Sequence, residues 1–346
     1  MSTKMNPTIR DVALEAAVSP MTASRVLSGQ AKVSESKRQA VLAAAGKLGY
    51  QVNPIVRSVM SEMRRRKANQ FAGTIAFLNT SNQESAWREH EYNRAYLEGA
   101  RERADQSGFA LDEIWIGQSD WPPLRTLKVL QTRRIRGFLI PPGGTEAQME
   151  FSFAEFAVAA FGSLPFKLLV NQVMPDYFYN SATCYEHLWA SGYRRIGLFS
   201  PDYDMSACEY QNVGGFLSAQ WKRPRKWHVP VGSGAVNWQA AEGAFLKWFQ
   251  QHRPDAIIVS YDQVPRWLEK IEVSIPRDIG LAHPLLSHNT AGWSGVDLRS
   301  RLQGEQAIDL LTAQILCNET GLPREPKRLV IPGVWVEGNT TQLVQA

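Results

Sequence analysis

The side chains best suited to chemistry lie close together near the start of the chain, at Thr22, Ser24 and Arg25. A guanidinium such as that of Arg25 can donate to both acceptors of guanine, O6 and N7, and hydroxyl groups suit phosphate oxygens. With Met21, Thr22 and Arg25 on one exposed helix face, this stretch predicts contact with a nucleic acid.

Two short helices joined by a tight turn are expected to position these residues. Thr8 is a suitable N-cap for a first helix over about residues 9–16. Ser19 is the next N-cap, and Pro20 takes the first helical position, where its missing N–H costs nothing. The second helix should run from Pro20 to about Leu27, which leaves three residues for the turn. This spacing predicts a helix-turn-helix unit.

A small apolar core should hold the unit together. On the second helix the inward residues are expected to be Ala23, Val26 and Leu27. A third helix, from a cap at Ser34 to Gly49, should close the core with residues at helical spacing: Val41, Leu42, Ala45 and Leu48. An ordinary three-helix bundle is the alternative interpretation.

A family resemblance covers the same part of the chain. The stretches TIRDVALEAAVSPMTASRVLSG, VSESKRQAVLAAAGKLGY and NPIVRSV closely resemble the DNA-binding headpiece of the LacI/GalR family of bacterial transcription regulators. In that family the second helix lies in the major groove. By position, the resemblance implies base choice by Pro20 and Met21, phosphate contacts by Thr22 and Ser24, and a base-edge contact by Arg25. One departure is Ala17, where the family often has a turn glycine.

Residues 53–70 are predicted to form a hinge helix and linker. Pro54 can begin a helix, and the resemblance implies that two such helices, one from each subunit, wedge an apolar side chain into the minor groove. Val59 takes the wedge position, where leucine is usual, and Met60 is the other candidate. A solvated basic linker is the alternative. The remaining expected DNA contacts lie at the helix starts and in this segment: Thr8, Ser19, Asn53, Arg57, Val59 and Met60.

Charge is distributed unevenly along the chain. Residues 1–67 contain twelve basic and four acidic residues, a net charge of +8, whereas the whole chain carries +5. The remaining residues therefore carry −3. A basic head on a mildly acidic body indicates a nucleic-acid-binding module joined to a second unit.

Composition limits the class of protein. The chain has 44% hydrophobic and 21% charged residues, which is typical of globular proteins. No apolar run is long enough for a membrane span, and the N-terminus lacks the features of a secretory signal. Cys184, Cys208 and Cys317 are too far apart in sequence for a disulfide framework or a CxxC metal site. We expect a cytoplasmic protein without a metal or other cofactor.

After about residue 71 the pattern alternates between short β-rich runs and amphipathic helices. The expected strands are GTIAFLN, FALDEIWI, GFLIP, KLLVN, RIGLFS, DAIIVS, IGLAH and RLVIP, and helices are expected at residues 92–107 and 303–318. This βαβ pattern predicts mainly parallel sheets, and its length favours two lobes. The resemblance implies a body like periplasmic sugar-binding proteins, with three chain crossings and an effector in the cleft.

The predicted fold class combines an all-α headpiece with an α/β body. The expected domains are a helix-turn-helix unit (1–52), a hinge helix and linker (53–70), and a two-lobed effector-binding and dimerisation domain (71–346).

Candidate effector-binding residues follow from the rule that ligands bind beyond the carboxyl ends of parallel strands. Asp262, in VSYDQVP, matches a family carboxylate by position. Tyr210 occupies the position at which many family members have an arginine, so this chain lacks that guanidinium. The two tryptophans nearest the expected cleft loops are included for stacking on a sugar. The full set is Asn79, Ser81, Trp87, Asp202, Tyr210, Asp262, His283 and Trp293. Of the other residues that follow expected strands, we note Pro141, Pro142, Ser200 and Ser260.

Enzyme activity is unsupported, because the chain contains no GxSxG, GxxxxGK[ST] or HExxH motif. We expect a homodimeric regulator that binds a palindromic operator, represses transcription and responds to a small molecule, with a sugar as the favoured effector. The alternatives are a solute-binding protein or a carbohydrate-processing enzyme with an accessory DNA-binding head. Induction and co-repression are both compatible with the sequence.

Overall fold

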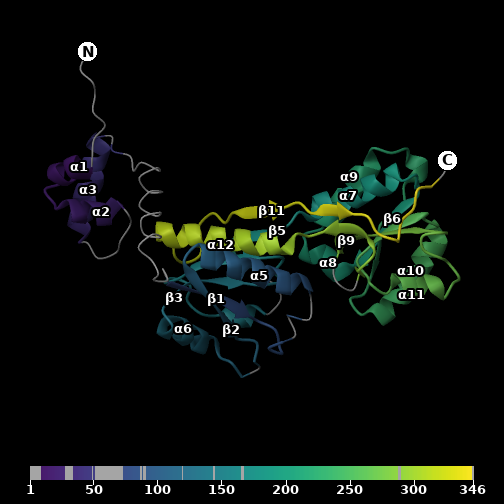
Figure 1. Cartoon of the computed structure of the whole chain (residues 1–346), viewed down its shortest axis with the longest axis horizontal. Helices are drawn as coiled ribbons and strands as arrows, with labels where there is room; N and C mark the ends of the chain where they lie inside the picture. Colours follow the sequence, from purple (N-terminus) through teal and green to yellow (C-terminus); the bar gives the residue numbers. More distant parts are fainter. Residues whose placement is uncertain are drawn as a thin grey trace, which may run out of the picture.

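A computed structural model of the chain describes residues 9–27, 34–48, 50, 73–85, 88, 91–118, 120–142, 145–164, 167–286 and 290–344. A helical headpiece precedes a body of two α/β lobes, which lie side by side (Figure 1). This confirms the predicted fold class, although the expected hinge helix at 53–70 lies outside the described residues. Of the helices described, none is both long and apolar enough to span a membrane.

The headpiece consists of α1 (Ile9–Glu15), α2 (Pro20–Leu27) and α3 (Glu35–Leu48). The Ser19 hydroxyl accepts a hydrogen bond from the backbone N–H of Thr22 at 3.2 Å, so Ser19 caps α2 as predicted. Ala17, in the turn, has a φ of 50°. Glycine adopts this left-handed conformation with the least strain, which accounts for a preference for glycine at the turn position.

The prediction that Leu42 closes the headpiece core is wrong. Val41, Ala44 and Ala45 on α3 are buried against Val12 and other residues of α1 and α2, whereas Leu42 is 54% exposed. A helix buries residues at i, i+3 and i+4, and Leu42 lies one position further round the helix from Val41. The small Ala44, three positions after Val41, is buried in the headpiece core instead of Leu42.

The N-terminal lobe is a parallel sheet covered by helices on both faces. Its strand order is β11-β5-β4-β3-β1-β2. The strands are β1 (Gly73–Asn79), β2 (Phe109–Trp115), β3 (Ile135–Ile140), β4 (Ala157–Phe161), β5 (Asn171–Pro175) and β11 (Arg328–Ile331). One face packs on α5 (Glu91–Gln106) and α12 (Ser300–Cys317), and the other packs on α6 (Pro123–Thr132) and η2 (Glu146–Met149).

The C-terminal lobe repeats this arrangement, with the strand order β12-β10-β9-β8-β6-β7 and only β12 antiparallel to its neighbour within the described part. The strands are β6 (Ile196–Pro201), β7 (Gly232–Gly234), β8 (Ala256–Val259), β9 (Gly280–Leu286), β10 (Ser294–Asp297) and β12 (Val334–Val336). One face packs on α7 (Tyr177–Ala190) and α9 (Gln211–Trp221), and the other on α10 (Trp238–His252) and α11 (Val264–Glu269). The short α8 (Asp202–Ala207) follows β6, and η3 (Arg225–Trp227) follows α9.

Most expected strands are present, but the region between β3 and α7 differs from the prediction. The sequence KLLVN was expected to be a strand, whereas residues 167–170 have no regular structure and β5 begins at Asn171. The fully buried β4, with the sequence AVAAF, was not expected. Alanine favours helices, so this strand is determined by its place between β3 and β5 and by burial on both faces. The short β7, β10 and β12 were also missed.

Within the described part of the body, the chain crosses between the lobes three times: at Asp176, at residues 298–299 and at residues 332–333. The first and third crossings are hydrogen-bonded to each other. The backbone N–H of Asp176 donates to the carbonyl of Ile331 at 2.9 Å, and that of Gly333 donates to Oδ1 of the buried Asn180 at 2.9 Å. The expected crossings are therefore present and joined.

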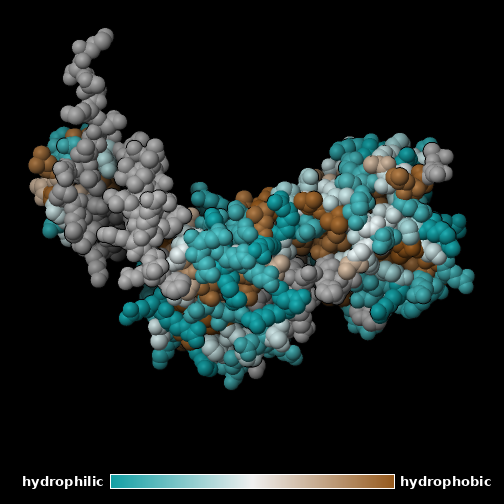
Figure 2. Space-filling view, in the orientation of Figure 1, coloured by the Kyte–Doolittle hydropathy of each residue, from teal (hydrophilic) through white to brown (hydrophobic). Residues whose placement is uncertain are grey.

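Apolar surface is exposed where the two lobes meet, over α7 and β11 (Figure 2). Phe178 and Tyr179 on α7 are 45% and 48% exposed, and Leu329 and Val330 on β11 are 39% and 44% exposed. Exposed apolar side chains gathered on an otherwise hydrophilic surface are typical of interfaces.

Glycines allow α5 and α12 to cross closely. A Cβ added at Gly304 would lie 2.0 Å from the carbonyl oxygen of Tyr96, whereas one added at Gly243 in α10 meets nothing within 4 Å. We expect Gly304→Ala to lower the free energy of unfolding by about 1–3 kcal/mol through overpacking. Gly243→Ala should raise this free energy by up to about 1 kcal/mol through helix propensity. Urea unfolding of both variants checks this, and equal effects would contradict the close crossing.

Candidate functional site

The predicted DNA-reading surface is the start of α2. The hydroxyls of Ser19 and Thr22 lie 2.9 Å apart, and Ser19 also caps the helix, so the fold itself positions these two expected DNA contacts. Four further expected contacts belong to α2, but their side chains lie outside the described structure: Pro20, Met21, Ser24 and Arg25. The rest of the expected interface also lies outside the described residues: Thr8, Asn53, Arg57, Val59 and Met60.

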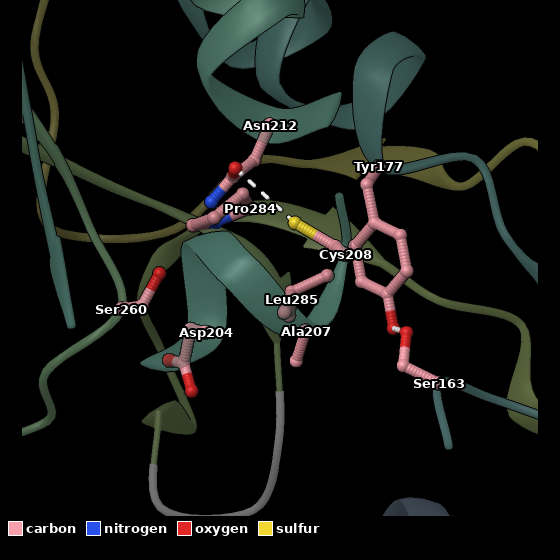
Figure 3. A pocket seen from close by; sticks show the side chains of 9 residues that line it. All are labelled: Ser163, Tyr177, Asp204, Ala207, Cys208, Asn212, Ser260, Pro284 and Leu285. Atoms are coloured by element: carbon pink, nitrogen blue, oxygen red, sulfur yellow. Dashed lines mark hydrogen bonds between the residues drawn. The ribbon is translucent and has the colours of Figure 1, made fainter. Parts of the chain in front are cut away.

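A pocket of about 100 Å³ lies where the two lobes face each other (Figure 3). The N-terminal lobe contributes Ser163, which follows β4, and Tyr177 begins α7 directly after the first crossing. The other lining residues come from the C-terminal lobe: Asp204, Ala207, Cys208, Asn212, Ser260, Pro284 and Leu285. Both lobes therefore contribute to the walls of this pocket.

Asp204 is the only charged residue among the described residues that line this pocket. Its carboxylate is half-buried and, within the described structure, accepts no hydrogen bond and pairs with no cation. Burial raises the pKa of Asp204 from 3.8 to about 6. Near neutral pH the pocket therefore contains a carboxylate that has lost part of its hydration without gaining a partner.

Asn212 and Cys208 form a second polar group in the pocket (Figure 3). Oδ1 of Asn212 accepts a hydrogen bond from the backbone N–H of Val213 at 2.8 Å and from the thiol of Cys208 at 3.2 Å. Burial raises the pKa of the Cys208 thiol, which keeps this thiol protonated near neutral pH and weakens it as a nucleophile. Cys208 is therefore better suited to packing and to orienting Asn212 than to covalent chemistry.

The remaining hydroxyls of the pocket also have partners. Ser163 donates to the Tyr177 hydroxyl at 3.2 Å, and Ser200 donates to Ser260 at 3.1 Å. Ser260 follows a strand, as expected for a cleft residue.

His283 and Asp262 lie beside the pocket but outside its lining. His283 is only 5% exposed, and burial lowers the pKa of its imidazole to about 4. Its Nδ1 accepts from the backbone N–H of Leu285 at 3.1 Å, and its Nε2 lies 3.7 Å from Oδ1 of Asp262. Because the imidazole is neutral near pH 7, this proximity is not an ion pair. The edge of Trp293 faces the imidazole, with ring centroids 5.9 Å apart.

Of the other expected effector residues, those that the structure describes do not line the pocket. Asn79 is buried, and its side chain holds the turn after β1 by bonding the carbonyl of Glu84 at 2.8 Å and the N–H of Ser81 at 3.1 Å. Asp202 and Tyr210 are exposed, and Tyr210 has a φ of 58° in the turn before α9. Trp87 lies outside the described residues.

Sequence reasoning missed four of the polar lining residues: Ser163, Tyr177, Asp204 and Asn212. Asp204 lies two residues beyond Asp202, on α8, which starts directly after β6. The strand-end rule therefore located the right segment but not the residue that lines the cavity. Among the described residues, no group of three or more His, Cys, Asp or Glu could hold a metal ion.

Two family models match separate parts of the chain. The model for bacterial regulatory proteins of the lacI family matches residues 8–53, and the model for a periplasmic binding protein-like domain matches residues 185–341. The chain therefore combines a lacI-family headpiece with a periplasmic binding protein-like domain.

Individual relatives match the chain over different lengths. It is 51% identical to the HTH-type transcriptional regulator GntR of Pseudomonas aeruginosa over 55 residues, which is 16% of either protein. It is 24% identical over 291 residues to the HTH-type transcriptional repressor PurR of Klebsiella pneumoniae, covering 79% of both. Its fold is similar to that of a complex of the transcriptional regulator CelR with cellobiose, with a TM-score of 0.60, 20% identity, and coverage of 96% of this chain and 99% of that one.

The pKa of Asp204 leads to a stability prediction. Because this pKa is raised in the folded state, the folded protein binds the proton more tightly than the unfolded chain, and stability falls as pH rises from about 4 to 7. At about pH 7.5, Asp204→Asn should raise the free energy of unfolding by about 1–2 kcal/mol. This gain should shrink towards pH 4. Asp204→Asn is compared by urea unfolding with the control Asp202→Asn, because Asp202 is an exposed residue in the same first turn of α8. A pH-independent effect of Asp204→Asn would contradict the raised pKa of Asp204.

Proposed function

We propose that this chain is a sequence-specific DNA-binding transcription regulator whose affinity for an operator is set by a small molecule held between the two lobes. The observation that carries this proposal is the pairing of two units in one chain. A headpiece of the lacI family occupies residues 8–53, and a body with a pocket lined from both lobes follows it. The first unit suits DNA reading, and the second suits ligand-dependent movement.

DNA reading is assigned to α2. Helix-turn-helix proteins place the second helix of the unit in the major groove, where the first residues of this helix reach base edges. Arg25 is assigned to a guanine, whereas Thr22 and Ser24 are assigned to phosphates. Residues 53–70 are assigned to the hinge, with Val59 or Met60 as the minor-groove wedge.

The effector is assigned to the interlobe pocket, and we place it in the class of sugars and sugar derivatives. The likeness to the CelR–cellobiose complex supports this class. The likeness to PurR, a transcriptional repressor, supports repression as the direction of control. Asp262 and His283 adjoin the pocket and are assigned to its outer wall.

A homodimer acting in the cytoplasm fits this role. Two headpieces related by a two-fold axis would read a palindromic site, with half-sites about one helical turn apart. The apolar surface on β11 and α7 supports a contact between bodies. No catalytic role is assigned to the chain.

Effector binding would act through the angle between the lobes. A ligand that contacts Ser163 of the N-terminal lobe and Asn212 of the C-terminal lobe stabilises one arrangement of the lobes over another. The two arrangements would differ in how they pair the hinge segments, and a preference for one of them shifts operator affinity by mass action.

Arg25 and the basic residues of the linker are expected to contribute differently to DNA binding: Arg25 to base preference, and the linker to affinity for any sequence. Arg25→Ala should weaken binding to the preferred operator by about 1–3 kcal/mol and relax base preference at one position. Replacing Arg64, Arg65 and Arg66 by Gln should instead weaken binding to all duplexes alike and flatten the salt dependence. Binding titrations over a salt series, on matched and scrambled duplexes, measure both effects. Unchanged base preference in Arg25→Ala would remove α2 from the recognition role.

A further inference from the structure

The electrostatics of the interlobe pocket restrict what it can bind. Among the described residues, its only charged group is the Asp204 carboxylate, and no Lys, Arg or His lines it. Nearby charges are also negative, because Asp204 and Asp202 both add to the burial that raises the pKa of Tyr261. Across the cleft, Arg328 is already held by Glu209 in a bidentate ion pair at 2.7 and 2.8 Å. Within the described structure, the carboxylate in the pocket therefore has no counter-ion.

A hydrogen-bond donor lines the same pocket. Asn212 is 94% buried, since only 6% of its surface is exposed. Its Oδ1 is occupied by Val213 and Cys208, which orients the amide and leaves its Nδ2 without a hydrogen-bond partner in the described structure. The Nδ2 atom itself is accessible from the pocket, where an acceptor atom on a ligand can take its hydrogen bonds.

The rest of the lining is largely apolar. Ala207, Pro284 and Leu285 present carbon atoms to the cavity, and the neutral Cys208 thiol adds no charge. This wall suits the hydrocarbon face of a small ring, and a volume of about 100 Å³ suits a single ring.

We propose that the effector is a small organic amine in its protonated form, whose ammonium group pairs with Asp204 and whose neighbouring oxygen accepts a hydrogen bond from Asn212. This inference rests on the proposed function and specifies the chemical class of the effector. An amino sugar or a cyclic amino alcohol meets the description. A phosphorylated or carboxylated sugar does not.

Cationic, neutral and anionic ligands differ in their interaction energy with the Asp204 carboxylate. A cation provides the partner that the half-buried carboxylate lacks, and the attraction is strengthened because water is partly excluded. A neutral polyol leaves the charge uncompensated. An anion adds a like charge beside it, which is unfavourable in a partly buried site.

Three probes that share a ring and a hydroxyl test this proposal: 2-aminocyclohexanol, cyclohexane-1,2-diol and 2-hydroxycyclohexanecarboxylate. Each is titrated against the full-length protein at about pH 7.5, where Asp204 is ionised, and binding is followed by saturation-transfer NMR. The amine should bind at least about tenfold more tightly than the diol, and the carboxylate should not bind. In Asp204→Asn the preference for the amine over the diol should fall below about twofold. Glu269→Gln, which removes an exposed carboxylate from α11, should keep the full preference.

Several outcomes would overturn the proposal. These are equal or tighter binding of the diol or the carboxylate, an amine preference that survives Asp204→Asn, and no binding of the amine at any concentration reached. Operator binding is measured on the same preparation. Operator binding without amine preference removes only this inference, whereas amine preference in a protein that binds no DNA sequence selectively removes the proposed function.

Discussion

The geometry of the body depends on the hydrogen-bonded junction at which the first and third crossings meet. Gly333 lies at its centre. Its N–H donates to the buried Asn180, and a Cβ at this position would lie 2.2 Å from a side-chain carbon of Val296. Only a glycine lets the returning chain pass so close to β10 and α7. Since Tyr177 follows the first crossing directly, the same junction also places its ring at the mouth of the pocket.

A second contact joins the lobes beside the pocket. Arg328 on β11 of the N-terminal lobe pairs with Glu209 in the turn between α8 and α9. Glu209 and Tyr210 in that turn both have left-handed backbone, with φ of 54° and 58°. The elements on either side of this turn carry Asp204 and Asn212. We therefore expect a change in the angle between the lobes to shift both polar groups that we assign to the effector.

Local signals in the sequence were sufficient for the headpiece and for most strands. Ser19 and Pro20 define the start of α2 because capping acts over a few residues, and RIGLFS reads as a strand through its own composition. The strand β4 could not be predicted, because AVAAF gains its conformation only from its neighbours in the sheet. The pocket was missed for a related reason. Tyr177 and Asn212 lie 35 positions apart in sequence and meet only through the packing of α7 on α9.

In the proposed function the relation between the lobes controls the headpiece, and a charge-swap cycle on the interlobe ion pair tests this control without an effector. Glu209→Arg and Arg328→Glu each place like charges across the cleft, whereas the double variant restores an opposite pair. Operator affinity would be measured for all four proteins on one duplex selected by the parent chain. Each single variant is expected to change operator affinity by about threefold or more, and the double variant to return it towards the parent value. Equal operator affinity in all four proteins would contradict control of the headpiece by the lobes.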